Sequence, residues 1–69
     1  MPIIINLDVE MAKKKMSLNA LSERTGISLT NLSLFKNGRA RGIRFTTLIL
    51  ICEVLHCQPG DIMEYRPEN

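Results

Sequence analysis

The sequence predicts an all-α fold built from five short helices. Hydrophobic residues make up 45% of the 69 residues, whereas aromatic residues make up only 4% and there is no Trp. The core must therefore be aliphatic, which suits packed helices. The clearest element is a stripe of apolar residues at i, i+3, i+4 and i+7, which is typical of one buried helical face. Its members are Leu48, Ile51, Cys52 and Leu55.

Each expected helix begins after a residue whose side chain can accept hydrogen bonds from the free amides of a first turn. The second and third helices each end before a glycine, Gly26 and Gly38, which takes left-handed backbone readily. Pro59 suits the first position of a short fifth helix that ends near Met63. The other expected helices are 7–15 after Asn6 or Asp8, 18–25 after Ser17, 29–37 after Ser28, and a fourth from Thr46 or Thr47 to about His56.

The two ends of the chain are expected to be extended. Residues 3–5 are three consecutive isoleucines, a β-branched run too short for a helix, and residues 64–66 precede Pro67. These segments can pair with each other in one chain, or between two chains, since an exposed strand edge recruits another strand. Pairing within one chain is favoured, because the termini of small domains are often close together.

The length of the chain suits one domain and leaves no room for a second. No apolar run approaches the roughly 20 residues of a membrane span. The N-terminal Met-Pro-Ile-Ile-Ile-Asn has neither the charged region nor the long apolar region of a signal peptide. We therefore expect a cytoplasmic protein.

The distribution of charge indicates a polyanionic partner more clearly than the formal net charge of +2 does. No acidic residue occurs between Glu23 and Glu53. That stretch therefore carries uncompensated positive charge, which is the electrostatic footprint of nucleic-acid binding. The cations within it are Arg24, Lys36, Arg39, Arg41 and Arg44.

Catalytic and metal-binding residues are too few for an enzyme or a metal site. Cys52 and Cys57 lie about 140° apart on a helix and share no face, so we expect small buried thiols rather than zinc ligands. The single histidine, His56, has no nucleophile and acid arranged around it, and no glycine-rich phosphate loop is present. We expect neither a cofactor nor a metal.

The segment from Ser17 to Gly38 predicts a helix-turn-helix. Two short helices, each with its own serine cap, meet at Thr-Gly-Ile-Ser over residues 25–28. The glycine permits the tight turn, Ile27 anchors it in the core, and Ser28 starts the second helix. That second helix can project its N-terminus into a DNA major groove.

The chain resembles the lambda-repressor/Cro-type (Xre-type) transcriptional regulators, in particular a small single-domain subgroup. The resemblance rests first on the motif Leu-x-x-Leu-Ser-x-x-Thr-Gly-Ile-Ser over residues 18–28. It rests also on Asn37-Gly38 and on the helix near Thr46-Thr47-Leu48, and it extends over about residues 7–63. It implies a compact five-helix lambda-repressor-like DNA-binding domain over 1–69, with the helix-turn-helix at about 17–38. Ser22 stands where the family usually has Ala, and its hydroxyl can bond back to the carbonyl one turn earlier.

The resemblance implies which residues of the third helix face DNA. Asn can pair bidentately with adenine, and Ser and Thr can bond several bases. Leu29 departs from the polar residues common in the family, so it either meets thymine methyl groups or belongs to an exposed apolar patch for a protein. Leu34 is also a departure and is placed, with Lys36, toward the rim. The expected base-reading residues are Leu29, Thr30, Asn31 and Ser33.

A second set of residues is expected to contact phosphates, which position the protein and supply salt-sensitive affinity. Residues 39–45 are expected to form a basic loop. Arg39 or Arg41 in this loop can alternatively enter the minor groove, and the loop can also be simply solvated. The lysines at 13–15 form either a solvated helix end or a further phosphate contact. The expected phosphate-contacting residues are Ser17, Asn19, Ser28, Lys36, Asn37, Arg39, Arg41 and Arg44, with simple capping as the alternative for the first two.

These expectations together describe a sequence-specific regulator of transcription, of bacterial or phage type and nucleoid-associated, and a repressor in particular. The resemblance implies a homodimer on double-stranded DNA, with no small-molecule ligand evident. Ile49 on the outward face of the fourth helix, Leu50 on its flank and the N-terminal strand are candidate dimer surfaces. The alternative is a protein-interaction module, such as an antitoxin, that uses Leu29, Leu34 and Ile49.

Overall fold

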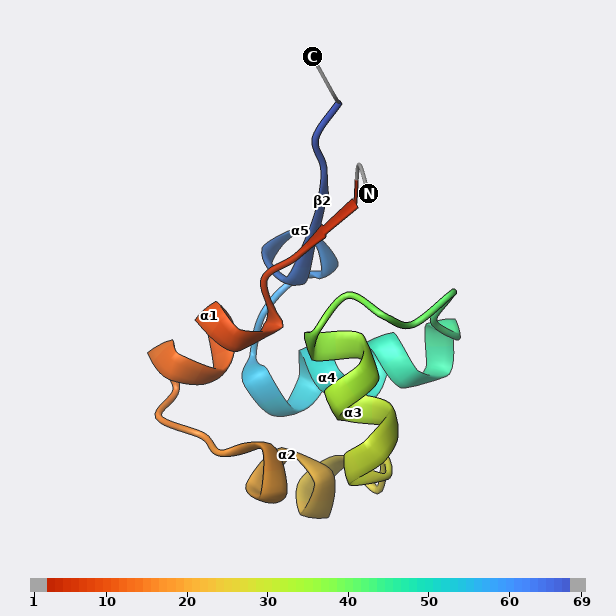
Figure 1. Cartoon of the computed structure of the whole chain (residues 1–69). Helices are drawn as coiled ribbons and strands as arrows, with labels where there is room; N and C mark the ends of the chain where they lie inside the picture. Colours follow the sequence, from red (N-terminus) through yellow and green to blue (C-terminus); the bar gives the residue numbers. More distant parts are fainter. Residues whose placement is uncertain (1–2, 68–69) are drawn as a thin grey trace.

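Five helices and a two-stranded sheet make up the computed structural model, which describes residues 3–67 (Figure 1). The helical fold predicted from the sequence is confirmed, and the terminal segments form the expected strands. In chain order the elements are β1 (Ile3–Ile5), α1 (Leu7–Lys13), α2 (Leu18–Thr25), α3 (Leu29–Lys36), α4 (Phe45–Leu55), α5 (Pro59–Ile62) and β2 (Met63–Tyr65).

The core is aliphatic apart from one phenylalanine and is shared by all five helices. Helix α2 packs against both α3 and α4, and α1 packs against α5. The apolar stripe predicted on the fourth helix faces inward, with Cys52 half-buried at its margin. The buried hydrophobic residues are Leu7, Met11, Leu21, Leu32, Phe35, Leu48, Ile51, Leu55 and Ile62.

The two terminal strands pair with each other within the chain, as favoured from the sequence. They run antiparallel, with Ile3 opposite Tyr65 and Ile5 opposite Met63, and stand above the helices at the top of Figure 1. The second strand begins at Met63, one residue earlier than expected, directly where α5 ends. This pairing ties both ends of the described chain to the helical core.

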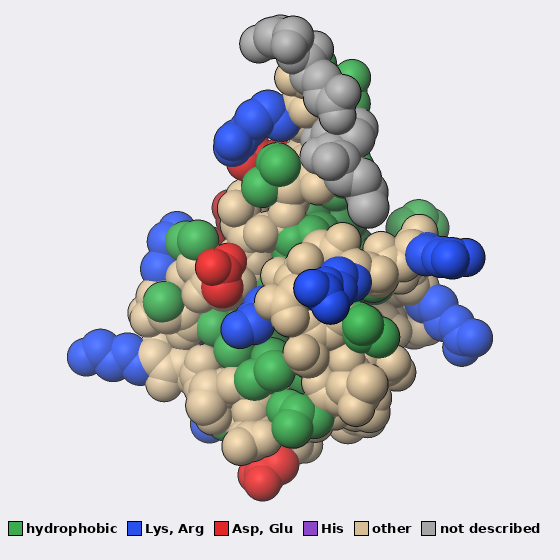
Figure 2. Space-filling model, in the orientation of Figure 1, with side chains coloured by type: hydrophobic (Ala, Val, Ile, Leu, Met, Phe, Trp, Pro, Cys, Tyr) green, Lys and Arg blue, Asp and Glu red, His purple; other side chains and the backbone are tan. Residues whose placement is uncertain are grey.

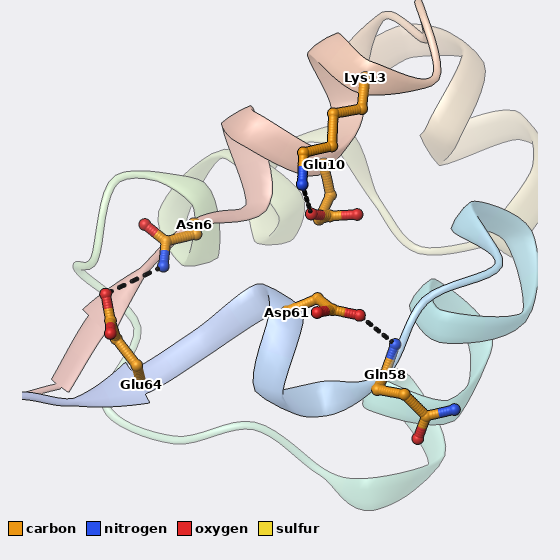
Figure 3. A network of polar contacts seen from close by, with 6 residues as sticks. All are labelled: Asn6, Glu10, Lys13, Gln58, Asp61 and Glu64. Atoms are coloured by element: carbon orange, nitrogen blue, oxygen red, sulfur yellow. Dashed lines mark hydrogen bonds and ion pairs between the residues drawn. The ribbon is translucent and has the colours of Figure 1, made fainter.

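Helix α1 has no side-chain cap, contrary to the expectation for Asn6 or Asp8. Asn6 is the N-cap residue, but its side-chain amide donates to Glu64 Oε1 of β2 at 3.3 Å (Figure 3). Arg66 donates to the same carboxylate oxygen. The helix ends at Lys13 rather than at residue 15, because Lys15 takes left-handed backbone with φ +52°.

Helix α4 starts two or three residues earlier than a cap at Thr46 or Thr47 would allow, so that expectation was wrong. Arg44 is the N-cap residue, and its carbonyl accepts the amide of Leu48 at 3.0 Å. Both threonines therefore lie in the first helical turn, where Phe45 extends the helix toward the preceding loop. Helix α5 begins at Pro59 as expected, and the amide of Gln58 donates to Asp61 Oδ2 at 2.9 Å (Figure 3).

The end of α4 brings together two cysteines that were expected to lie apart. His56 takes left-handed backbone with φ +51°, so the chain reverses and the amide of Cys57 donates to the carbonyl of Cys52 at 3.1 Å. Both cysteines are half-buried there, rather than fully buried as expected. Burial raises the pKa of Cys52, while burial together with the neighbouring Cys52 raises the pKa of Cys57 to about 11. Both groups are therefore neutral thiols at physiological pH.

Candidate nucleic-acid interface

Helices α2 and α3 form a helix-turn-helix joined by the three residues 26–28, at the lower part of Figure 1. Each helix has the serine cap expected from the sequence. Ser17 Oγ accepts the amide of Ala20 and Ser28 Oγ accepts the amide of Asn31, both at 3.1 Å. Each hydroxyl keeps its proton free to donate, so capping and a contact to a phosphate oxygen are compatible at both serines.

The turn itself is held by side-chain hydroxyls. Gly26 takes left-handed backbone with φ +76°, a conformation that favours glycine. The hydroxyl of buried Thr25 donates to the carbonyl of Leu21 at 2.7 Å and accepts the amide of Ile27 at 3.2 Å. The Ser22 hydroxyl donates forward to the carbonyl of Ile27 at 2.6 Å rather than back to the preceding turn, which corrects the expectation for that residue.

The exposed face of α3 is centred on Thr30 and Leu34. Leu32 and Phe35 point into the core, and at about 100° per residue the opposite face carries Thr30 and Leu34. A shallow groove runs along each side of this face, one toward α2 and one toward α4, and Leu34 lines both. Leu34 therefore lies on the crest, the ridge between the two grooves, and not at the rim where it was expected.

The remaining expected base-reading residues lie on the two sides of that crest. Leu29 and Ser33 line the groove toward α2, together with Thr30. Asn31 lines the groove on the other side, beside Arg44 and the start of α4. Leu29, Thr30 and Asn31 are exposed and Ser33 is half-buried. The four residues therefore occupy one continuous surface of α3.

The loop between α3 and α4 presents three exposed arginines. Arg44 lies beside Asn31 in the groove toward α4, whereas Arg41 borders a hollow that the terminal strands also line. The first turn of the loop is fixed by Gly38, whose backbone has φ +71°, and by the amide of Arg39, which donates to the carbonyl of Leu34 at 2.9 Å. Ala40 and Ile43 are half-buried against the core, whereas Arg39, Arg41 and Arg44 are exposed. The two apolar residues thus anchor the loop and leave its cations in solvent, and Figure 2 shows basic side chains projecting there.

None of these arginines forms an ion pair with another described residue. Within residues 3–67 the ion pairs are Lys13 with Glu10 and Arg66 with Glu64, neither of which involves the loop. The positive charge of the loop is therefore available to a partner.

The other expected phosphate-contacting residues are less uniformly placed. Asn19 is exposed in the first turn of α2, and exposed Asn37 at the end of α3 directs its amide to Ser33 Oγ at 3.5 Å. Lys36 is half-buried and lies about 120° around the helix from Thr30, off the exposed face. The lysines at 13–15 are exposed at the end of α1.

Phe45 is a surface residue that the sequence analysis missed. It is 80% exposed, the highest value among the exposed large hydrophobic residues of the described chain. From the sequence Phe45 was expected in the basic loop 39–45, although its spacing of four from Ile49 is that of two residues on one helical face. Ile49 is 54% exposed and Leu50 40% exposed, so the outward face of α4 is apolar.

Residues 3–67 contain neither a cluster of metal ligands nor a membrane-spanning helix. No group of three or more His, Cys, Asp or Glu side chains there is placed to hold a metal ion. None of the helices in that range is long and apolar enough to cross a membrane.

Known proteins are similar to this chain in sequence and in fold. A family model described as the Cro/C1-type HTH (helix-turn-helix) DNA-binding domain matches residues 6–68. The chain is 60% identical to the uncharacterized HTH-type transcriptional regulator YozG of Bacillus subtilis (strain 168), over all of this chain and 82% of that relative. The crystal structure of the transcriptional regulator VanUg superposes with a TM-score of 0.77 at 29% identity, covering 97% of this chain and 88% of that one.

These similarities confirm the family that the sequence was seen to resemble. They agree with the expectation that the chain is not an enzyme, because the family is a class of transcriptional regulators. The chain belongs to the Cro/C1-type helix-turn-helix family of DNA-binding transcriptional regulators.

Proposed function

We propose that this regulator binds double-stranded DNA sequence-specifically, with α3 in the major groove, and represses transcription. The observation that carries the proposal is the exposed face of α3, which adjoins Arg44 at Asn31 and is followed by a loop whose three arginines form no ion pair within residues 3–67. A helix fits the major groove, and cations beside it meet the flanking phosphates. A domain seated on a promoter blocks polymerase without further contacts, which favours repression over activation. Its place of action is the cytoplasm, at the nucleoid.

The residues divide into two roles in this proposal. Thr30, Asn31 and Ser33 read base edges through hydrogen bonds, and Leu29 does so through apolar contact. The phosphates are held by the loop arginines and by polar groups at the ends of α2 and α3. We assign the smallest phosphate role to Lys36, because it lies off the exposed face. The other residues proposed to contact phosphates are Ser17, Asn19, Ser28, Asn37, Arg39, Arg41 and Arg44.

Selection from a randomised duplex library at about physiological salt tests this function. An enriched inverted repeat with half-sites about 34 Å apart would support a dimeric sequence-specific regulator. An enriched single half-site would support base reading without the dimer. Retention of DNA only at low salt, with no enriched sequence, would overturn the proposal, because phosphate contacts alone carry no sequence information.

The proposal includes a homodimer formed through the outward face of α4. Phe45, Ile49 and Leu50 are exposed there, and Glu53 is the single charged residue in the helix. A two-fold axis at Ile49 brings the two apolar faces together and sets Phe45 of one helix opposite Glu53 of the other. Such a self-complementary arrangement is what a two-fold interface requires.

Sedimentation equilibrium without DNA tests the dimer. Ile49→Asp should yield monomers, whereas Val9→Asp on α1 should not, although Val9 is also an exposed aliphatic residue at 46%. A wild-type chain that stays monomeric up to millimolar concentration would refute this interface.

A second candidate function is a protein-interaction module on the same scaffold. It is favoured by the exposure of Leu29, Leu34 and Ile49, at 44%, 42% and 54%. Tight binding of a copurifying protein that is lost on alanine substitution at Leu29 and Leu34, with only salt-sensitive and sequence-independent DNA binding, would support this function over the first.

A further inference from the structure

Three leucines meet on the surface between α2 and α3. They line an open groove in which Leu18 comes from α2, while Leu29 and Leu34 come from α3. Leu29 and Leu34 are 44% and 42% exposed, and Leu18 is half-buried. Figure 2 shows hydrophobic side chains reaching the surface at the lower part of the molecule, where these two helices lie.

The fold does not need these two α3 leucines for its core. The side of α3 that faces inward is filled by Leu32 and Phe35. Leu29 and Leu34 lie away from that side, so their apolar surface remains in water in the free protein. Contiguous exposed apolar surface of this kind marks an interaction site.

The polar groups beside the leucines define the kind of ligand. The groove is also lined by the hydroxyl-bearing residues Thr30 and Ser33. Leu34 at its edge also lines the neighbouring groove that holds Asn31 and Arg44. The groove is therefore continuous with the surface that carries the proposed DNA contacts. On the base edges of the major groove the one apolar group is the C5 methyl of thymine.

We propose that this leucine groove, formed by Leu18, Leu29 and Leu34, binds thymine methyl groups in the major groove and thereby selects thymine at defined positions of the half-site. The inference rests on the proposed function, because it requires α3 to enter that groove. Leu34 on the crest and Leu29 at the helix start contact the methyls, and Leu18 forms the floor. The hydroxyls of Thr30 and Ser33 remain free to bond polar edges of the same or neighbouring bases.

The consequence is a specificity that does not depend on hydrogen bonding at these positions. Uracil pairs with adenine as thymine does and differs only in lacking the C5 methyl. A protein that reads the methyl therefore distinguishes two duplexes that have identical hydrogen-bonding groups and identical phosphates. Burying one methyl is worth about 0.8 kcal/mol, which corresponds to about a fourfold change in affinity.

The test replaces each thymine of the selected half-site, one at a time, by deoxyuridine and measures the dissociation constant by fluorescence anisotropy. For the wild-type chain, at least one replacement should weaken binding about fourfold. For Leu34→Ala or Leu29→Ala the thymine and uracil duplexes should bind equally at the position that the deleted leucine contacts. Val9→Ala on α1, an exposed aliphatic residue outside the groove, should keep the wild-type ratio.

Each other outcome overturns the inference in a way that separates it from the proposed function. If a sequence is enriched but every uracil duplex binds like its thymine parent, the leucine groove does not read methyls, while sequence-specific binding stands. If the leucine variants keep the wild-type ratio, the methyl is read elsewhere. If no sequence is enriched, the proposed function fails, and this inference fails with it. Because the uracil change lies in the DNA, misfolding cannot imitate its effect.

Discussion

The hydroxyl of Ser22 donates a hydrogen bond of 2.6 Å to the carbonyl of Ile27, across the turn between α2 and α3. The amide of the same Ile27 donates to the hydroxyl of Thr25 at 3.2 Å. Both backbone groups of Ile27 are thus hydrogen-bonded to side chains of α2. Such bonds are needed in this turn because its backbone groups have no partners in a helix or sheet. These bonds fix the entry of the chain into α3 and hence the position of its exposed face.

Removing either hydroxyl should destabilise the domain. Ser22→Ala leaves the carbonyl of Ile27 without its partner and should lower the free energy of unfolding by about 1 kcal/mol. Thr25→Val should cost more, about 1–3 kcal/mol, because buried Thr25 both donates to the carbonyl of Leu21 and accepts from Ile27. Urea unfolding followed by circular dichroism measures both effects.

The matched control for these variants is Thr46→Ala. Thr46 is exposed in the first turn of α4, and its hydroxyl makes no hydrogen bond within residues 3–67. This control should leave the urea midpoint nearly unchanged. A midpoint for Ser22→Ala equal to that of the wild type would show that the bond across the turn contributes nothing to stability.

Lys15→Gly should stabilise the domain. Lys15 has φ +52°, a left-handed conformation that costs a residue with a β-carbon roughly 1–2 kcal/mol. Glycine relieves that strain, but its greater conformational freedom in the unfolded chain reduces the gain in stability by about 0.5–1 kcal/mol. A net gain of about 0.5–1 kcal/mol should appear as a higher thermal unfolding midpoint.

The neighbouring lysine provides a control of the same charge. Lys14 has φ −94° and ψ 1°, which side chains adopt without strain. Lys14→Gly should therefore lower stability by about 0.5–1 kcal/mol, through the unfolded-state entropy alone. Equal shifts for the two variants would argue that removal of a positive charge, and not backbone strain, explains the result.

The loop arginines should contribute to DNA affinity independently of sequence. Replacing Arg39, Arg41 or Arg44 by Gln should each reduce the slope of log affinity against log salt by about 0.9, because each phosphate contact releases counterions. The preferred sequence should not change. Titrations at several salt concentrations, on the selected site and on an unrelated duplex, measure both quantities.

Two further basic residues calibrate that experiment. Lys36→Gln should change the slope less than Arg39→Gln, since Lys36 is half-buried and off the exposed face. Arg66→Gln should leave the slope unchanged, because Arg66 is paired with Glu64 beside the terminal strands. If Arg66→Gln reduced the salt slope by about one and the loop variants left it unchanged, the DNA would bind on another face.

Stability should fall at alkaline pH because of Cys57. Its pKa is raised from 9.0 to about 11, mainly by burial and then by Cys52. Above pH 9 the thiol ionises in the unfolded chain but not in the folded one, so its contribution is complete below that pH and is lost by about pH 11. Urea midpoints from pH 8 to pH 11 should decline less steeply for Cys57→Ala than for the wild type. Parallel declines would exclude the thiol as a cause.

Local patterns in the sequence were sufficient for most of the helical architecture. Ser17, Ser28 and Gly26 predicted three helix ends, and the structure has the same three caps. Helix α3 ends at Lys36, one residue earlier than expected, with Asn37 as its C-cap and Gly38 next to it at positive φ. Capping and apolar periodicity act within one or two turns, so they can be read without knowing the tertiary contacts. The stripe ending at Leu55 predicted the buried face of α4 for the same reason. The family and its regulatory function followed from the combination of these motifs.

Contacts between distant residues decided the rest. Asn6 bonds Glu64 of β2 instead of capping α1, a choice that depends on strand pairing between the two ends of the chain. Leu34 belongs to the crest of the exposed face because the packing of Leu32 and Phe35 sets the rotation of α3. A hydrophobic period defines which residues share a face, but only the positions of the neighbouring helices determine what that face meets.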